Sequence, residues 1–357
     1  MDQALSLIVN DFINEPAHAD YDDESEDDAD DDIADLLQMF RRERTFNHIR
    51  ISHYVEQVVD KYSEAEFRSH FRISRAGVLV SDNHKQNLRF CLQKLLNTLG
   101  NDPVLAIPGQ LRVPKRQALL FALWLLATQE AFRSTADRFG FERGHAFRLC
   151  MKIWEELYDN SSHWISLPTG DSALQKMEEF QKLGFPGFIG VKFHSVLLQG
   201  ICDADMRFID VFCGFPGSAH DARVWTESPL GQALAADWQT MLPKDSHFLG
   251  DKAYPSLNYL DVPFKNDGQM TPQRKAFNKK LSKVRVKIEH AFGRLSGIFT
   301  RMKYLRVILK YAEYYITRIS ACVLHNIVLE EGFHLGGLPI EMHEEKESRG
   351  NSERVET

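Results

Sequence analysis

The sequence has no paired-cysteine motif, no long apolar run and no basic leader. Its cysteines are few, widely spaced and without a C-x-x-C pair: Cys91, Cys150, Cys202, Cys213 and Cys322. Zinc ribbons and disulfide frameworks are therefore poorly supported. No apolar run reaches the roughly 18 residues of a membrane span, and the start of the chain, MDQALSLIVNDF, has no basic residue. These absences predict an intracellular protein with no membrane segment, whose cysteines are buried free thiols.

Positive charge is missing from the beginning of the chain. Residues 1–35 contain fourteen Asp or Glu and no Lys or Arg, and residues 341–357 contain six acidic and three basic residues. The remainder, 36–340, therefore carries a net charge of +10 although the whole chain carries −7. A basic body is compatible with a nucleic-acid-binding surface, and equally with ordinary surface charge.

Composition divides the chain into four regions. Residues 1–35 form an acidic arm that we expect to be disordered, since the run 21–35 cannot bury apolar area. The arm either solubilises the chain, which we favour, or competes with DNA for the basic surface. Residues 36–160 have helical apolar spacing, residues 175–330 mix strands and helices, and residues 335–357 are expected to form a disordered tail.

Residues 113–157 have the pattern of a helix-turn-helix. Pro114 can begin a helix, and Gly140 lies in the turn before a last helix that starts near Glu142. That helix would present three side chains to a DNA groove or to phosphates: Arg143, His145 and Arg148. The alternative is a plain helical bundle that packs on its neighbour.

Residues 175–330 predict a mixed α/β sheet flanked by helices. Residues 187–191, 193–202 and 206–215 are rich in aromatic and β-branched residues and indicate strands, with a hairpin around 202–205. A short apolar strand ends near Asp251, and long helices follow it. This order of strands and then helices is typical of a mixed sheet covered by helices.

Two carboxylates stand out in this region, Asp251 after the apolar strand and Glu289 inside a basic helix. Residues 273–310 contain twelve Lys or Arg, and Glu289 is their one acidic residue. Glu289 could form an ion pair with Arg285 or Lys287, or it could bind a hard cation such as Mg²⁺ or Mn²⁺. Two-metal phosphodiester chemistry needs two to four converging carboxylates, and spacing alone does not decide between these readings.

Four segments occur in an order that resembles a known family. They are CDADMRFIDVFCGFPGSAHDARVW (202–225), LGDKAYP (249–255), VRVKIEHAFGRL (284–295) and CVLHNIVLE (322–330). Together they resemble the DDE-type nuclease domain of Harbinger transposases and the host proteins derived from them. The resemblance covers roughly residues 60–330, and the family carries a helix-turn-helix where residues 113–157 lie.

The resemblance implies an RNase H-like mixed sheet flanked by helices, preceded by the all-α helix-turn-helix region. It also implies an acidic triad that binds two divalent cations, Mg or Mn, and cleaves or joins DNA phosphodiester bonds. Asp251 matches the second acidic residue and Glu289 the third, as catalytic residues and metal ligands. His220 and Asp221 match a supporting segment, PGS-x-HD.

The first catalytic Asp of the family is not found. It would follow GFPGFIGV (184–191), but this segment runs straight into KFHSVLLQG, so the Asp motif and its linker are absent at the Val191–Lys192 junction. Asp203 and Asp205 lie in the expected hairpin turn, and Asp210 is a weak substitute ligand. A skipped exon, an incompletely defined gene or a decayed copy would each explain the gap.

The sequence therefore predicts a DNA-acting nuclease homologue with weak or no cleavage. A non-catalytic DNA-binding adaptor is the alternative, and a transcription factor that acts through residues 36–160 alone is a third reading. Expected partners are DNA and either a helix-turn-helix or Myb-like protein or a second copy. The expected location is the nucleus, with the cytoplasm as a second one. DNA contacts are expected from Arg143, His145, Arg148, Lys283, Arg285, Lys287 and Arg294.

Overall fold

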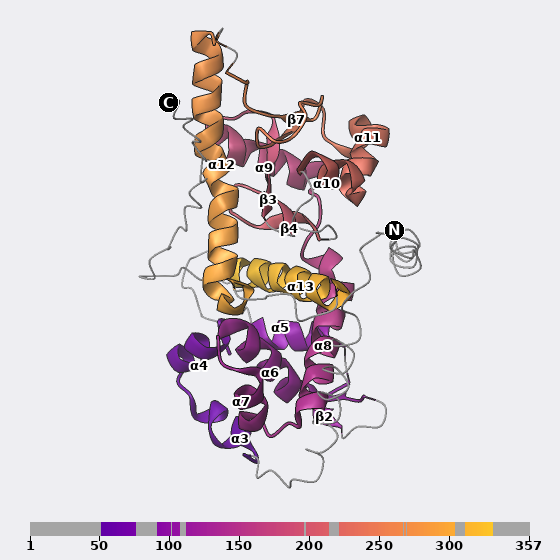
Figure 1. Ribbon diagram of the computed structural model, residues 1–357, viewed down its shortest axis with the longest axis vertical. Helices are drawn as coiled ribbons and strands as arrows, with labels where there is room; N and C mark the ends of the chain where they lie inside the picture. The colour runs from indigo at the N-terminus through magenta and orange to yellow at the C-terminus, as the bar shows by residue number, and fades with distance from the viewer. Residues whose placement is uncertain are drawn as a thin grey trace, which may run out of the picture. The chain divides into compact units, whose positions relative to one another are not determined.

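A computed structural model describes most of the chain between residues 51 and 330 (Figure 1). The described residues are 51–75, 91–100, 102–107, 112–195, 198–213, 221–266, 268, 270–303 and 311–330. They belong to one compact unit, Arg50–Thr357. The predicted acidic arm, the predicted tail and His220 lie outside the described residues. Within the described part, no helix is long and apolar enough to cross a membrane.

The first half of the described chain is mainly helical. Its elements are α3 (Tyr54–Gln57), η2 (Val59–Lys61), α4 (Glu64–Phe71), α5 (Cys91–Thr98), β1 (Val104–Leu105), β2 (Val113–Pro114), α6 (Lys115–Ala127), α7 (Phe132–Arg138), α8 (Arg143–Asp159), η3 (Ser161–His163) and α9 (Gly170–Lys182). Helix α6 is buried along nearly its whole length because its sequence, KRQALLFALWLLA, is apolar on every side. Gly140, with φ of 75°, makes the turn between α7 and α8.

The second half contains the sheet and the helices that cover it. Its elements are β3 (Phe188–Ser195), β4 (Leu198–Cys202), β5 (Phe208–Phe212), α10 (Asp221–Glu227), α11 (Pro229–Met241), β6 (His247–Leu249), β7 (Leu260–Asp261), α12 (Pro272–Ile298), η4 (Thr300–Lys303) and α13 (Tyr311–Glu330). The five strands lie in the order β5-β4-β3-β6-β7, with β4 antiparallel to β3 and β5, and β6 parallel to β3 and β7. The prediction of a mixed sheet flanked by helices is confirmed.

Each face of the sheet packs against a different set of helices (Figure 1). On one face, Val191 and Leu249 join a core that includes Val284 and Ile288 of α12. On the other face, Ile201 packs with residues of α10 and α11. Buried residues recur every three or four positions along α12, which explains why this 27-residue helix lies along the sheet.

The Leu324–His325–Asn326 motif fastens α13 to the sheet. The buried Asn326 side chain accepts a hydrogen bond from Phe208 N (2.8 Å), and its Nδ2 donates to Phe208 O (2.7 Å) and Trp164 O (2.8 Å). The buried His325 ring lies 3.0 Å, through Nε2, from Met206 O. These two residues therefore hold α13 against β5 and its hairpin.

Strand β3 differs from the sequence prediction. We predicted separate strands at 187–191 and 193–202, but β3 runs without a break through Val191 and Lys192, and β4 begins only at Leu198. With no linker between the two segments, the backbone continues extended, and Ser195 of β3 pairs with Leu198 of β4 inside the predicted second strand.

Two helices also differ from expectation. Helix α9 follows Thr169 and was not predicted, although Ser172 and Thr169 form reciprocal capping bonds at its start. The segment HDARVWTESPLGQAL (220–234) has the apolar spacing of one amphipathic helix, but it is divided between α10 and α11, because Ser228 caps α11 and Pro229 begins it.

Candidate functional site

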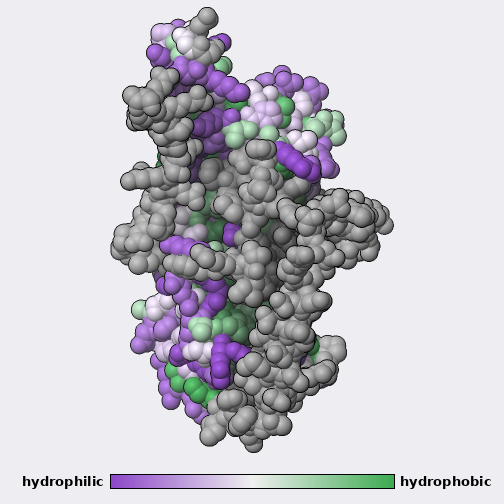
Figure 2. All heavy atoms as spheres, in the orientation of Figure 1, coloured by the Kyte–Doolittle hydropathy of each residue, from purple (hydrophilic) through white to green (hydrophobic). Residues whose placement is uncertain are grey.

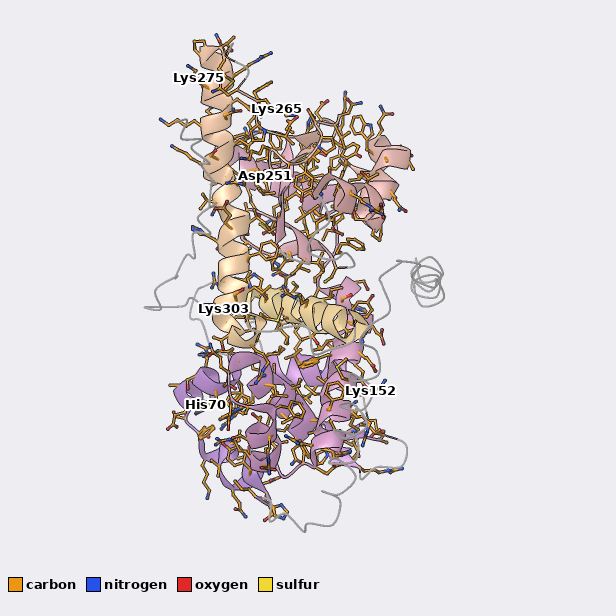
Figure 3. All side chains as sticks on the ribbon, in the orientation of Figure 1. His70, Lys152, Asp251, Lys265, Lys275 and Lys303 are labelled. Carbon is orange, nitrogen blue, oxygen red and sulfur yellow. The ribbon has the colours of Figure 1, made fainter. Side chains whose placement is uncertain are left out.

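Asp251 follows the carboxyl end of strand β6, beside the middle of α12 (Figure 3). Its Oδ1 accepts a hydrogen bond from Ala253 N at 3.0 Å, which fixes the turn that leaves the strand. Gly250 precedes it where a Cβ would lie 3.1 Å from Leu260 Cδ1, so the chain can pass close to β7. The local fold therefore holds the Asp251 carboxylate toward the helix.

Arg285 joins the two predicted catalytic carboxylates. Its Nη1 lies 2.5 Å from Asp251 Oδ2, and its Nη2 lies 3.0 Å from Glu289 Oε1. The three side chains are 33%, 15% and 28% exposed for Arg285, Asp251 and Glu289, so the group is reached by solvent without lying open on the surface. The structure thus brings Asp251 and Glu289 together around a cation that the protein itself supplies.

Strand β3 contributes no carboxylate to this group. Val191 pairs with Leu249 of β6 in parallel register, so the following residues of β3 run alongside the chain that leads to Asp251. The sequence of β3, FIGVKFHS, contains no Asp or Glu. The position from which a central strand could supply a third ligand is therefore not acidic in this chain.

Asp210 does not replace that ligand, which corrects the suggestion made from the sequence. Asp210 pairs with Ile201, and Ile201 pairs with Lys192, so the three side chains lie in one row on one face. Ile201 packs in the core beside α10 and α11. Asp210 therefore lies on the face opposite α12 and cannot meet Asp251 there.

Lys192 occupies an aromatic cage on that opposite face. It is 0% exposed, and its Nζ lies 3.5 Å from the ring centre of Trp225 and 3.8 Å from that of Tyr254. These rings belong to the PGS-x-HD-x-R-x-W and GD-x-x-YP motifs. Burial raises the pKa of Asp210 to about 6, against the opposing charge of Lys192. One aromatic ring from each motif therefore contacts the ammonium group of Lys192, the residue that follows the Val191–Lys192 junction.

A second acidic cluster lies at the β4–β5 hairpin. Glu179, Asp203 and Asp205 approach closely enough to share a cation, and Lys176 Nζ lies 2.8, 2.9 and 3.4 Å from their respective oxygens. Burial opposes the charge of Lys176, but Asp203 and Glu179 outweigh it and raise the pKa of the ammonium group. Asp203 Oδ1 also accepts hydrogen bonds from Asp205 N and Arg207 N. Lys176 therefore offsets one of the three negative charges, and the cluster was missed because α9, which carries Glu179, was not predicted.

The donor set at Asp251 and Glu289 fits one divalent cation and does not fit two. Both carboxylates already converge on one guanidinium, which stands in for a cation at that point. Mg²⁺ commonly uses one or two carboxylates together with substrate phosphates, whereas paired metals need more carboxylates than these. A metal ion would also have to compete with Arg285.

The predicted recognition helix α8 offers Arg143 and Arg148, but not His145. Both arginines are exposed, whereas His145 is 7% exposed and packs edge-on to Phe141. Burial lowers the pKa of His145. The Glu142 carboxylate accepts hydrogen bonds from Gly144 N and His145 N, each at 3.3 Å. A phosphate therefore cannot use the amino terminus of α8.

The four predicted DNA contacts on α12 have different environments. Lys283 is exposed and Lys287 is half-buried. Arg285 is engaged by Asp251 and Glu289, and Arg294 has a buried Nε, with burial lowering the pKa of its guanidinium. Of the four, Lys283 is the most accessible to a nucleic acid. Asp221 begins α10.

Replacing Arg285 by methionine is expected to strengthen Mn²⁺ binding about tenfold or more. The change frees both carboxylates from a competing cation, and tenfold corresponds to about 1.4 kcal/mol, a modest amount for partly exposed ion pairs. Electron paramagnetic resonance titration of free Mn²⁺ would measure it. Arg274→Met, on the same helix, is the matched control and should not change the affinity. Equal Mn²⁺ binding by Arg285→Met and the wild type would contradict the assignment.

Comparison with known proteins agrees with the motifs. Residues 188–329 match the DDE superfamily endonuclease family. The chain is 26% identical over 247 residues to a Rattus norvegicus protein named "Putative nuclease HARBI1", covering 62% of this chain and 69% of that protein. For the Homo sapiens protein of the same name, the identity is 26% over 230 residues, covering 57% of this chain and 64% of that protein.

A plant protein is similar as well. The Arabidopsis thaliana protein "Protein ALP1-like" is 24% identical over 248 residues, covering 58% of this chain and 59% of that protein. No solved structure matches the chain. The resemblance to Harbinger transposase-derived nucleases is confirmed, and it is carried by residues 188–329, which match the DDE superfamily endonuclease family.

Proposed function

We propose that this chain is a transposase-derived protein that binds DNA through a nuclease fold, and that it cleaves phosphodiester bonds weakly or not at all. One observation carries the proposal: Asp251 and Glu289 meet through Arg285, beside a strand β3 that has no acidic residue. Two carboxylates neutralised by a guanidinium are a poor centre for two-metal catalysis.

An RNase H-like fold is part of this proposal. Its support is the strand order, in which three antiparallel strands are followed by two parallel ones. The carboxylates also come from the places that the family resemblance implies, after β6 and on the long helix α12.

Asp251 and Glu289 would hold one Mg²⁺ or Mn²⁺ ion if Arg285 released them. A bound ion of this kind supplies a Lewis acid and a polarised water near a phosphate. Arg285 is close enough to both carboxylates to neutralise them when no ion is bound. We propose that the residual site positions a phosphate through Arg285 and does not activate water efficiently.

DNA is the proposed partner, contacted by the helix-turn-helix through Arg143 and Arg148 and by α12 through Lys283 and Lys287. Both arginines and Lys283 are exposed, and Lys287 is half-buried. A helix-turn-helix or Myb-like protein, or a second copy of this chain, would add the sequence specificity that backbone contacts lack. Such a role places the protein in the nucleus, with the cytoplasm as a second location.

A plasmid-nicking assay in Mn²⁺ tests the catalytic half of the proposal. The wild-type protein is expected to leave supercoiled plasmid at the level of a protein-free sample, and so are Asp251→Ala and Glu289→Ala. A labelled duplex should still bind to all three proteins, as measured by fluorescence anisotropy.

The assay also separates the second candidate function, a metal-dependent nuclease. The match of residues 188–329 to the DDE superfamily endonuclease family favours that candidate. Efficient nicking by the wild type that both alanine variants abolish would establish it and overturn the proposal of weak or absent cleavage. Failure of the wild type to bind any duplex would overturn the proposal of a DNA-binding protein.

A further inference from the structure

Four lysines recur at every fourth position along the first part of α12. They are Lys275, Lys279, Lys283 and Lys287. Each step advances about 6 Å along the helix and turns about 40° around it, because a helix rises 1.5 Å and turns about 100° per residue. The four ammonium groups therefore form one inclined row, which we call the lysine row.

The lysine row is unfavourable for the helix itself. Like charges four residues apart destabilise a helix, and residues 272–288 contain seven Lys or Arg and no acidic residue. Within the described part of the chain, none of the four lysines forms an ion pair. Lys275, Lys279 and Lys283 are exposed, and Lys287 is half-buried. Folding does not require such an arrangement, so it indicates a polyanionic ligand.

Contacts with the preceding segment hold the first turns of α12, which carry the start of the lysine row, in place. Asn278 receives a hydrogen bond from Phe264 N and donates one to Phe264 O, both at 2.9 Å. The Phe264 ring lies 5.4 Å from that of Phe277, and the Arg274 guanidinium lies 5.0 Å from the Phe264 ring. The segment that precedes α12 therefore braces the helix on a side that leaves the row free.

The row begins with Lys275 on the end of α12 that extends past the sheet and continues along the part of the helix that packs against the sheet. Figure 3 shows Lys275 near the amino-terminal end of the helix and Asp251 farther along it. Figure 2 shows hydrophilic residues gathered over the same end. Leu281, Val284 and Ile288 face the core, so Lys275 and Lys279 point away from it. A long ligand can thus lie along the row without displacing the sheet.

We propose that the lysine row binds the phosphate backbone of duplex DNA. The inference rests on the proposed DNA-binding function and adds the surface through which α12 engages the nucleic acid. Regularly spaced cations without hydrogen-bonding neighbours suit sequence-independent phosphate contacts, whose strength comes from the release of counterions. An acidic protein would supply a less regular series of charges.

The experiment compares three variants of the full chain, of which the first two each remove three positive charges. Lys275→Gln, Lys279→Gln and Lys283→Gln are combined in the row variant. Three exposed lysines on other elements are replaced in the control variant: Lys61→Gln, Lys182→Gln and Lys244→Gln. The third variant combines Arg143→Gln and Arg148→Gln. Fluorescence anisotropy with a labelled duplex of arbitrary sequence gives the affinity at several salt concentrations.

The row variant is expected to reduce the slope of log affinity against log salt concentration by about 1 for each lysine, or about 3 in all. The control variant, with the same net charge, should keep the wild-type slope. Glutamine preserves helix propensity, and loss of like-charge repulsion should leave the melting temperature of the row variant equal or higher. Weaker binding therefore cannot be explained by unfolding.

The outcomes distinguish this inference from the proposed function. A wild-type protein that binds no duplex overturns both. A wild-type protein that binds, with an unchanged slope in the row variant and a reduced slope in the Arg143 and Arg148 variant, overturns only the lysine row. Tighter wild-type binding of poly-glutamate than of duplex DNA, lost in the row variant, also overturns it, since the row would then serve an acidic protein.

Discussion

Replacing Asn326 by alanine is expected to lower the free energy of unfolding by about 3–5 kcal/mol. The substitution removes three buried hydrogen bonds and leaves Phe208 N, Phe208 O and Trp164 O without a partner in the core. Each unsatisfied buried group costs about 1–3 kcal/mol, so the total approaches the stability of an ordinary domain. Urea unfolding followed by circular dichroism measures the change.

Asn278 is the matched control for this prediction. Its amide makes the same two-way contact, with Phe264 N and Phe264 O, but at an exposed position. Water can replace these bonds, so Asn278→Ala should cost about 1 kcal/mol or less. If the two alanine variants lose similar free energies of unfolding, burial is not the reason that Asn326 stabilises the fold.

Two buried groups are expected to give opposite pH dependences of stability. Burial lowers the pKa of His325 from 6.5 to about 4, so between these values the unfolded chain binds more protons and stability rises with pH. Burial raises the pKa of Asp210 from 3.8 to about 6, so in that interval the folded chain binds more protons and stability falls as pH rises. Each effect amounts to about 3 kcal/mol, and in the wild type they largely offset each other.

Single substitutions should expose each effect. Relative to the wild type, His325→Gln is expected to lose about 3 kcal/mol between pH 4 and 6.5, because only the Asp210 contribution remains. Asp210→Asn should gain about the same amount between pH 3.8 and 6, because only the His325 contribution remains. Chemical denaturation across this range gives the free energy of unfolding of each variant relative to the wild type. Other titrating groups contribute equally to both proteins, so their effects cancel in this difference. Parallel curves for all three proteins would refute the buried protonation states.

The sequence was sufficient to predict a long basic helix at α12 and to single out two carboxylates of the candidate site. Apolar positions at helical spacing placed α12, and the family motifs singled out Asp251 and Glu289, which the structure brings to one guanidinium. Arg285 was considered from the sequence as a partner of Glu289 alone. Its second bond, to Asp251, depends on how the helix packs beside β6, and periodicity carries no such information.

The remaining differences arise from contacts between distant segments. His145 was expected to face DNA, but Phe141 and the helix packing bury it. Asp210 could not be assigned to a face from the sequence, since either side of a strand can be buried when both faces carry helices. The cage around Lys192 joins residues from three separate segments. The positions of Asp210 and Lys192 depend on the register of the sheet, and that of His145 depends on the packing of the helices.

The guanidinium between Asp251 and Glu289 also affects how well the fold tolerates the loss of a catalytic residue. A nuclease centre without its metal is a stability burden, because close carboxylates repel each other and are retained for activity rather than for folding. Arg285 turns that repulsion into two attractions within the fold. A protein with this arrangement can lose a catalytic ligand on a neighbouring strand and still keep the other two. Selection can then maintain the fold of such a protein even where the chemistry of the centre is lost.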